Sequence, residues 1–599
     1  LKAWKSHRDE YLDKLHRLEG RGDAAHLHSC PKCGVRPGKI RCEDCFGEEL
    51  LCETCCVHTH QSNPLHVVKR WNGRSFERCT LKQLGLRVQL GHVNSTCPCP
   101  RKGNVDFTII HTNGVHSVAV DFCGCEDQNP GSMRQQLLRR RWFPGTVTEP
   151  QTCCTFACLK QFHTLTLQSK VSGYDYYRAL ECLADNTGIN PPPERLKTFM
   201  RIVRQWRHLR MLKRAGIRYD GRPIAETLPG ELAVLCPACP QVGINLPLGW
   251  EDAPADQAYL HTLFLTLDAN FRLKNKMVSS DATDPGLHTG WAYFVEHSEY
   301  KKHILKFANQ KDISTCSGLA ALAMANTKYS KGYRATGVGS AVCRHQVVQR
   351  CGVGDLQKGE RYCNMDYVLF SSMTFHSVKT VMFSYDIACQ WTKNLHKRIE
   401  DLPPPLREAA SRPGVETKTA IPKFHENGHG PDCKDDYSLN YIEGVGRFEG
   451  EQVERNWAMI NPVATSTKEM GPGSRRDTLD DHWGGWNFDR LKGIGLSLWK
   501  KLKHAVPELK SQKEALQKLE AVINKGDLTK WKKMVKDWEL NKKKENPYRL
   551  PKTGMTEADI RLQLAGEDAQ AAEDASEVGD APKTRAAFLV MGIDLEDAQ

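Results

Sequence analysis

The chain has 599 residues, of which 40% are hydrophobic and 26% charged, and both values are ordinary for a soluble protein. This length predicts several domains with more than one core. No apolar run reaches the roughly 18–20 residues that a membrane span needs, so we expect no membrane partner. The net charge of +13 favours a polyanionic partner, although many soluble proteins are mildly basic.

Cysteines dominate the N-terminal part of the chain. Half of the 24 cysteines lie before residue 130, arranged largely as pairs separated by one or two residues, with histidines among them. In a chain without a secretory signal pattern, this arrangement indicates zinc rather than disulfides. Two-residue spacing lets both thiolates of a pair reach one tetrahedral zinc at about 2.3 Å. We therefore expect a domain over residues 1–130 that is built on structural zinc; the rival interpretation is a reduced, cysteine-rich loop.

The first three cysteine pairs and the histidines after them resemble the cross-braced zinc fold of B-box modules. That resemblance implies two zinc sites, one formed by Cys30, Cys33, Cys52 and Cys55 and the other by Cys42, Cys45, His60 and His66. The segment 107–125 alternates, and its Asn113-Gly114 turn predicts a β-hairpin. Around this hairpin we expect a third zinc site, formed by His92, Cys97, Cys123 and Cys125, in which Cys99 could replace one ligand.

Residues 131–250 are rich in helix formers and basic residues, which predicts a helical linker region. The segment 199–216, FMRIVRQWRHLRMLKRAG, has apolar residues at near-helical spacing and Arg and Lys on the other face. That face could lie along phosphates or simply be solvated. Cys236 and Cys239 form an isolated pair of cysteines that are possible metal ligands. Its candidate partners, which could equally be buried thiols, are Cys153, Cys154 and Cys158.

Residues 251–470 predict an α/β domain. The run LFLTLDANF at 263–271 predicts a strand that ends near Asp268, followed by a turn and a second, basic strand. GYRATGVGSAVCRHQVVQ at 332–349 predicts a strand pair, and GERYCNMDYVLFSSM at 359–373 predicts a helix. TVMFSYDIACQW at 380–391 predicts a buried strand that ends at Asp386 and leads into a helix.

A third acidic motif, RFEGEQVERNW at 447–457, predicts a helix that carries Glu449, Glu451 and Glu454. A carboxylate at the end of a buried strand is costly unless a cation offsets its charge. Three such groups brought together would hold two hard divalent cations, which can drive phosphoryl transfer on nucleic acid.

The order of these elements is typical of the RNase H-like fold of nucleases and integrases. There the first Asp lies on strand one, the second follows strand four, and a Glu lies on a later helix. The motifs DANFRLK, GVGDLQKGERY, SYDIACQW and STKEMGPGSRRDTLDDHWG resemble those of the Kyakuja-Dileera-Zisupton (KDZ) transposases. LLRRRWFP and LQSKVS resemble the CxC-type cysteine cluster associated with that family. The resemblance covers residues 1–495.

This resemblance implies a DDE-type DNA transposase that uses magnesium or manganese for phosphodiester cleavage and strand transfer. It implies transposon ends and target DNA as partners, a homo-oligomer and a nuclear location. It places the catalytic carboxylates on Asp268 and Asp386, with Glu451 favoured over Glu454 as the third. Asp366, Asp480 and Asp481 are not assigned to the site. The alternative is an inactive derivative that acts as a zinc-dependent DNA, chromatin or protein binder.

Three further segments complete the sequence. His425, His429 and Cys433 could bind a metal, with Cys389 as a further ligand, or have a hydrogen-bonded structural role in a loop. GPGSRRDTLDDHWGGW at 471–486 could bind phosphate through backbone amides and two arginines, or be a plain turn. Residues 471–563 predict a basic helical region, and 564–599 predict an acidic, disordered tail.

Overall fold

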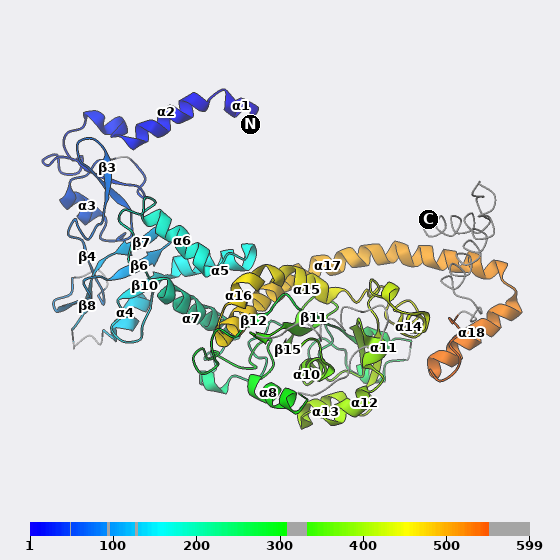
Figure 1. Ribbon diagram of the computed structural model, residues 1–599. Coiled ribbons are helices and arrows are strands. Elements are labelled where there is room, and N and C mark those ends of the chain that lie inside the picture. Colours follow the sequence, from blue (N-terminus) through cyan, green and yellow to red (C-terminus); the bar gives the residue numbers. More distant parts are fainter. Residues whose placement is uncertain (48, 93–95, 126–129, 255, 308–331, 550–599) are drawn as a thin grey trace, which may run out of the picture.

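The computed structural model describes residues 1–549 except 48, 93–95, 126–129, 255 and 308–331, so the acidic tail predicted at 564–599 lies outside the described residues. Figure 1 shows a cysteine-rich region at one end and an α/β core in the middle. Helix α17 (Pro472–Val522) begins on this core and runs outward to α18 (Lys525–Leu540).

The N-terminal region consists of small sheets held between loops. After α1 (Lys2–Lys5), α2 (Arg8–Glu19) and the turn η1 (Gly22–His26), one antiparallel sheet has the order β1 (Ile40–Cys42), β2 (Val68–Trp71), β3 (Phe76–Cys79), with α3 (Glu53–Thr59) beside it. A second sheet has the order β4 (Arg87–Gln89), β8 (Ala119–Cys123), β5 (Pro100–Lys102). A third has the order β7 (Gly114–Ser117), β6 (Thr108–His111), β10 (Thr152–Thr155), β9 (Trp142–Pro144).

The predicted hairpin is confirmed. Strands β6 and β7 are antiparallel, and His111 lies opposite Gly114 across the turn. The φ of Gly114 is +137°, a backbone conformation that residues other than glycine rarely adopt.

A helical layer follows, formed by α4 (Met133–Arg139), α5 (Phe156–Ser169), α6 (Gly173–Ala184) and α7 (Leu196–Arg214). The apolar faces of α5, α6 and α7 share a core that contains Phe162, Tyr177 and Phe199, whereas α4 packs through Leu137 into the neighbouring core of Phe107 and Phe122. Helix α7 confirms the helix predicted at 199–216. Its basic face is not simply solvated, because Arg207 is buried against α17, where it lies 3.3 Å from Asp481.

The central sheet has the order β15, β14, β11, β16, β17. Strand β11 (Leu263–Asn270) is antiparallel to β14 (Gly337–Cys343), which is antiparallel to β15 (Val348–Leu356). On its other side β11 is parallel to β16 (Thr380–Tyr385), and β16 is parallel to β17 (Glu416–Ala420). The strand predictions at 263–271, 332–349 and 380–386 are therefore confirmed.

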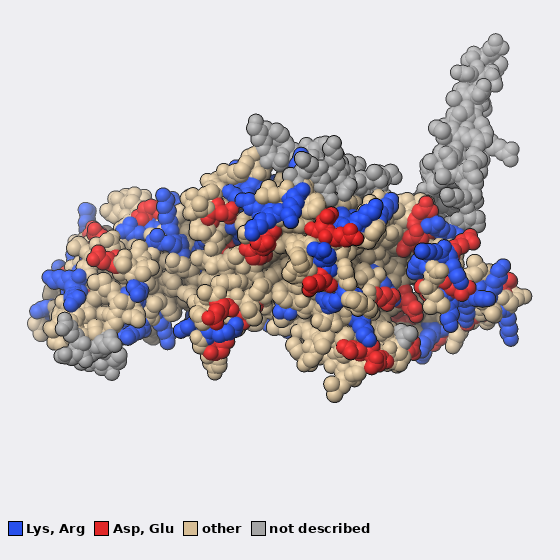
Figure 2. Space-filling view, turned by 90° about the horizontal axis from the view of Figure 1, so that it is seen from below, with Lys and Arg blue, Asp and Glu red and all other residues tan. Residues whose placement is uncertain are grey.

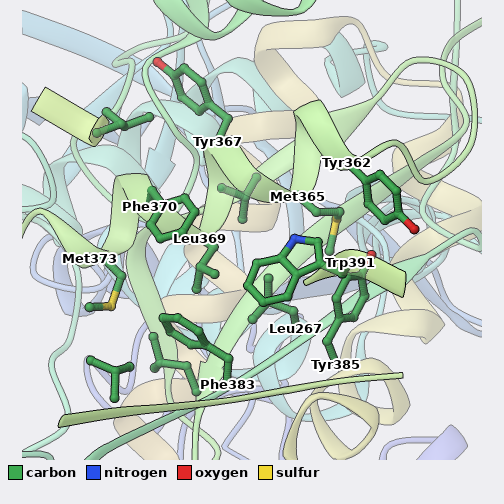
Figure 3. Packing of buried hydrophobic residues seen from close by; sticks show 14 of the residues in the cluster. Leu267, Tyr362, Met365, Tyr367, Leu369, Phe370, Met373, Phe383, Tyr385 and Trp391 are labelled. Carbon is green, nitrogen blue, oxygen red and sulfur yellow. The ribbon is translucent and has the colours of Figure 1, made fainter. Parts of the chain in front are cut away.

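Alternation along β11 and β16 sends side chains into two different cores. Leu267 and Tyr385 pack on one face beside α10 (Tyr362–Met373), and Figure 3 shows them with Trp391 and Phe383. On the other face, Phe264 and Met382 lie in a separate core with Phe448. Farther along the same face, α15 (Gln452–Ile460) covers β11 and β14 and packs against the start of α17, where Trp457 and Trp483 are buried. Residues next to Leu267 and Tyr385 in sequence therefore point toward α15.

Shorter elements surround the sheet. They are η2 (Ile224–Glu226), η3 (Trp250–Asp252), η4 (Ala258–His261), β12 (Asn275–Lys276), α8 (His297–Lys306), β13 (Tyr333–Ala335), α11 (Ala388–Trp391), α12 (Leu395–Glu400), α13 (Pro404–Ala410), η5 (Glu426–Gly428), α14 (Pro431–Tyr437), η6 (Asn461–Val463) and α16 (Ala464–Lys468). The helix expected after Asp386 is split into α11 and α12. The basic strand expected after Asp268 is reduced to β12, which pairs with β13.

Among the described residues, none of the helices combines the length and apolar character needed to cross a membrane.

Candidate functional site

Asp268 and Asp386 lie side by side at the ends of adjacent strands. Leu267 on β11 is paired with Tyr385 on β16. Asp268 directly follows Leu267 in the chain, and Asp386 directly follows Tyr385. Strands β11 and β16 are parallel, and neighbouring strands are about 4.8 Å apart. The two carboxylates therefore lie close together at the carboxyl ends of these two strands, on one face of the sheet. Each negative charge therefore acts on the other.

Helix α15 packs against β11 beside the two carboxylates. Trp457 of α15 donates its indole Nε1–H to Asp268 Oδ2 over 2.6 Å, which fixes that carboxylate. Glu454 lies three residues earlier on the same helix, in its first turn, so its side chain projects toward the same side as Trp457. The charge of Glu454 contributes to raising the pKa of both aspartates.

Glu449 and Glu451 precede α15 instead of lying within it, so the predicted helix begins later than expected. Gly450, with φ +83°, passes so close to Ser384 and Pro422 that a Cβ atom would collide with them. Glu451 is the residue before the helix, and its carboxylate accepts the Phe424 N–H over 3.1 Å. Glu449 pairs with Arg455 over 2.7 Å.

Glu360 is a further acid at this site that the sequence patterns did not single out. It is buried, and its carboxylate accepts a hydrogen bond from the Tyr385 hydroxyl. Burial and the charge of Asp386 raise the pKa of Glu360 to about 8. Its own charge in turn contributes to raising the pKa of Asp268.

The environment makes ionisation of these acids costly. Burial, followed by the charges of Asp386, Glu360 and Glu454, raises the pKa of Asp268 well above its usual range. Burial raises the pKa of Asp386 to about 6, although the nearby His425 opposes this. Burial also raises the pKa of Glu451. A cluster of carboxyl groups with raised pKa values is typical of a functional site.

The N-terminal ligands predicted from sequence are brought together in the predicted groups. In each group, the ligand atoms all lie within 4.8 Å of one another. The groups are Cys30 with Cys33, Cys52 and Cys55; Cys42 with Cys45, His60 and His66; and His92 with Cys97, Cys123 and Cys125. Cys99 is exposed and is not among these ligands. Each arrangement is compatible with structural zinc.

The ligand set predicted at His425, His429 and Cys433, with Cys389 as a further ligand, is brought together only in part. His429 and Cys433 form a group with Cys389, and the Cys389 sulfur lies 3.6 Å from His429 Nδ1. His425 is not one of these three ligands; it lies beside the acids, where its charge opposes the raised pKa of Asp386. The segment is not a plain loop either, because Pro431 begins α14, a position where its missing N–H costs nothing.

The isolated cysteine pair, Cys236 and Cys239, lies in one cluster with Cys343 and His345, which were not predicted as its partners. The candidate partners Cys153, Cys154 and Cys158 are buried in the cores of the N-terminal region, which was the alternative left open for them. The missed signal was the spacing Cys343-x-His345, directly after a predicted strand.

The segment at 471–486 is neither a phosphate loop nor a turn. It forms the first turns of α17, and Arg475 is buried there in a 2.6 Å ion pair with Asp355. Asp480 accepts the backbone N–H groups of Tyr293 and Phe294. Asp366, also left out of the site, accepts hydrogen bonds from Trp391 and Arg398, and so has a structural role.

Comparison with known families agrees with this arrangement. Residues 261–487, which contain both aspartates and α15, match the Kyakuja-Dileera-Zisupton transposase family. Residues 81–188 match the CxC2-like cysteine cluster associated with KDZ transposases. The chain belongs to the KDZ transposases.

For this KDZ transposase, no curated protein and no solved structure gives a match. Membership in the family implies a DNA-processing enzyme that binds DNA. The KDZ match includes the acidic cluster, and the CxC2 match includes the group formed by His92, Cys97, Cys123 and Cys125.

Proposed function

We propose that this KDZ transposase is a DDE-type enzyme whose catalytic domain has an RNase H-like fold. The sheet order supports the fold, since β11, β14 and β15 are antiparallel neighbours and β16 and β17 continue the sheet in parallel. The observation that carries the proposal is the position of the acids. Asp268 lies on the first of these strands and Asp386 directly after the fourth, and they meet at one edge.

The residues present fit divalent cations. Asp386 Oδ1 is buried and has no hydrogen-bond partner within the described part of the chain, so a cation would satisfy it. Clustered carboxylates are the ligands that Mg²⁺ and Mn²⁺ prefer. Asp268, Asp386 and Glu454 would hold the ions. When bound, such ions activate a water or a 3′-hydroxyl at neutral pH and stabilise the leaving oxygen at phosphorus.

The chain's own residues prepare these carboxylates. Trp457 holds one oxygen of Asp268 in place, so the orientation of that side chain is set before DNA binds. We propose Glu454 in preference to Glu451 as the third carboxylate, because its charge acts on both aspartates while Glu451 is engaged by the Phe424 amide. A homo-oligomeric assembly on DNA and a nuclear location are further proposals that rest on the family.

The experiment is a manganese-dependent nicking assay on DNA that carries the sequences flanking this reading frame. We expect Asp268→Asn, Asp386→Asn and Glu454→Gln each to slow nicking by about 100-fold or more, because each removes a direct ligand. The matched control Glu451→Gln should lose less than about tenfold. DNA binding should persist in all four variants.

Full nicking by both aspartate variants would refute the assignment of the site. If the unsubstituted protein binds this DNA but never nicks it, the chain is instead the inactive, zinc-dependent binder. Equal losses for Glu451→Gln and Glu454→Gln would leave the aspartates in place and refute the choice of Glu454.

A further inference from the structure

A Cys/His cluster lies inside the α/β core, apart from the cysteine-rich N-terminal region. Cys236 and Cys239 come from the segment that precedes the central sheet, Cys343 is the last residue of β14, and His345 lies in the turn between β14 and β15. His345 Nδ1 lies 3.4 Å from the Cys236 sulfur, 3.5 Å from the Cys239 sulfur and 4.0 Å from the Cys343 sulfur.

These separations fit the corners of one tetrahedron. Zinc–sulfur bonds of about 2.3 Å and zinc–nitrogen bonds of about 2.0–2.1 Å place tetrahedral ligand atoms roughly 3.6–3.8 Å apart. The ligand atoms of the four residues all lie within 4.8 Å of one another. The three cysteines are buried and none of them forms a disulfide. A covalent bond between the sulfurs therefore does not explain why the three thiols and the imidazole lie together.

The backbone on the first side of the cluster is held in place by side chains. The Asn245 amide donates to the carbonyl oxygens of Pro237 and Cys239, and its oxygen accepts the Gln241 N–H. The Gln241 amide in turn donates to the Cys236 carbonyl over 2.8 Å. These bonds curl the Cys236-x2-Cys239 segment so that both sulfurs face the same point, as ligating backbone segments require.

The second side is equally fixed. In the β14–β15 turn, Cys343 donates its N–H to Val347, and Gln346 donates its N–H to Cys343. The Trp486 indole of α17 donates to the Gln346 carbonyl over 2.6 Å. The turn therefore presents Cys343 and His345 from a rigid frame.

We propose that Cys236, Cys239, Cys343 and His345 bind one structural zinc ion, which fastens the segment before the sheet to the β14–β15 turn. Four protein ligands close the coordination shell, which is typical of structural and not catalytic zinc. Cys343 lies opposite Leu265 on β11, three residues before Asp268, so the ion lies about 10 Å along the strand from the acids. The proposal is independent of the chemistry proposed for the acidic site.

The test measures zinc per chain in the 599-residue protein by elemental mass spectrometry. We expect Cys236→Ser with Cys239→Ser to lose one zinc ion per chain relative to the unsubstituted protein, and Cys343→Ser with His345→Ala to lose one as well. All four substitutions together should still lose just one, because both pairs hold the same ion. The control Cys351→Ser, at a buried cysteine of β15 outside the cluster, should lose none.

Undiminished zinc in either double variant would overturn the proposal, and so would a loss of two ions in the quadruple variant. If the variants do not fold, alkylation of the unsubstituted protein decides. A zinc chelator should then make Cys236, Cys239 and Cys343 reactive together while Cys351 stays protected. Unchanged reactivity of these three cysteines after zinc removal would also overturn the proposal.

Discussion

At the scale of single residues, Glu360 changes the description of the acidic site. It comes from the turn before α10, away from the three acidic motifs, yet its charge interacts with those of both aspartates. Burial and mutual repulsion thus raise the pKa values of the acids in this site. Protonation or cation binding relieves that repulsion.

This predicts that stability without added magnesium falls as pH rises. The folded-state pKa values of Asp386, about 6, and Glu360, about 8, lie above the ordinary values of 3.8 and 4.5. The protonated forms therefore favour the fold at low pH, and this contribution is lost between about pH 4 and pH 8. At about 1.4 kcal/mol per pKa unit, the two groups together account for a loss of at most about 8 kcal/mol.

The measurement is the free energy of unfolding by denaturant from pH 5 to pH 8. Glu360→Gln should flatten the decline above pH 6, while the control Glu408→Gln, at an exposed position on α13, should not. Added magnesium should stabilise the protein more at pH 8 than at pH 5. A profile that Glu360→Gln leaves unchanged would show that Glu360 does not belong to the cluster.

At the scale of elements, α17 connects the two halves of the molecule. Its first turns are buried against the central sheet and against α5 and α7 of the N-terminal helical layer (Figure 1). Asp481 lies 3.0 Å from His163 of α5 and 3.3 Å from Arg207 of α7. Burial disfavours the charge of Asp481, but these two partners more than offset it and keep its pKa below the usual range.

We predict that Asp481→Asn destabilises the protein by about 3–5 kcal/mol, because Arg207 is left as a buried charge without its carboxylate. The matched control on the same helix is Asp489→Asn, which removes a pair with the exposed Lys492 and should cost less than about 1 kcal/mol. Equilibrium denaturation measures both changes. Equal, small effects would show that α17 does not depend on this ion pair.

At the scale of the whole molecule, the positive charge on the face shown in Figure 2 is not gathered into one stripe. Figure 2 shows Lys and Arg side chains interleaved with Asp and Glu over the face that it presents. A local basic group does occur around Glu449, which precedes α15. Desolvation, together with the charges of Arg344 and Arg455, lowers the pKa of Lys501 on α17, and Arg455 directly follows Glu454.

We predict that Arg455 and Lys501 contact the phosphates of DNA that approaches the acids. Arg455→Ala with Lys501→Ala should weaken DNA binding, and the slope of log K against log salt should fall by about one for each lost contact. The control Lys301→Ala, on α8 away from the acidic edge, should keep the slope of the unsubstituted protein. Salt titrations of DNA binding provide the measurement. An unchanged slope in the double variant would place the DNA elsewhere.

Several features of the fold could be predicted because they depend on neighbouring residues. Alternation and apolar runs located β11 and β16 with their aspartates, and the Asn113-Gly114 turn located a hairpin. Two-residue spacing located the cysteine pairs. The segment 471–486 at the start of α17 was expected to bind phosphate or to form a turn, because its glycines and prolines are typical of turns. Tertiary contacts of Arg475 and Asp480 made it helical.

The sequence by itself determined which residue types carry the chemistry: acids at the ends of apolar strands, and thiols and imidazoles at ligand spacing. The tertiary structure decided which of them meet. It brought Cys343 and His345 to Cys236 and Cys239, and it placed Glu360 and Glu454 close enough to the aspartates for their charges to interact. The physical reason is that strand register and helix packing join segments far apart in the chain, and no local pattern records those contacts.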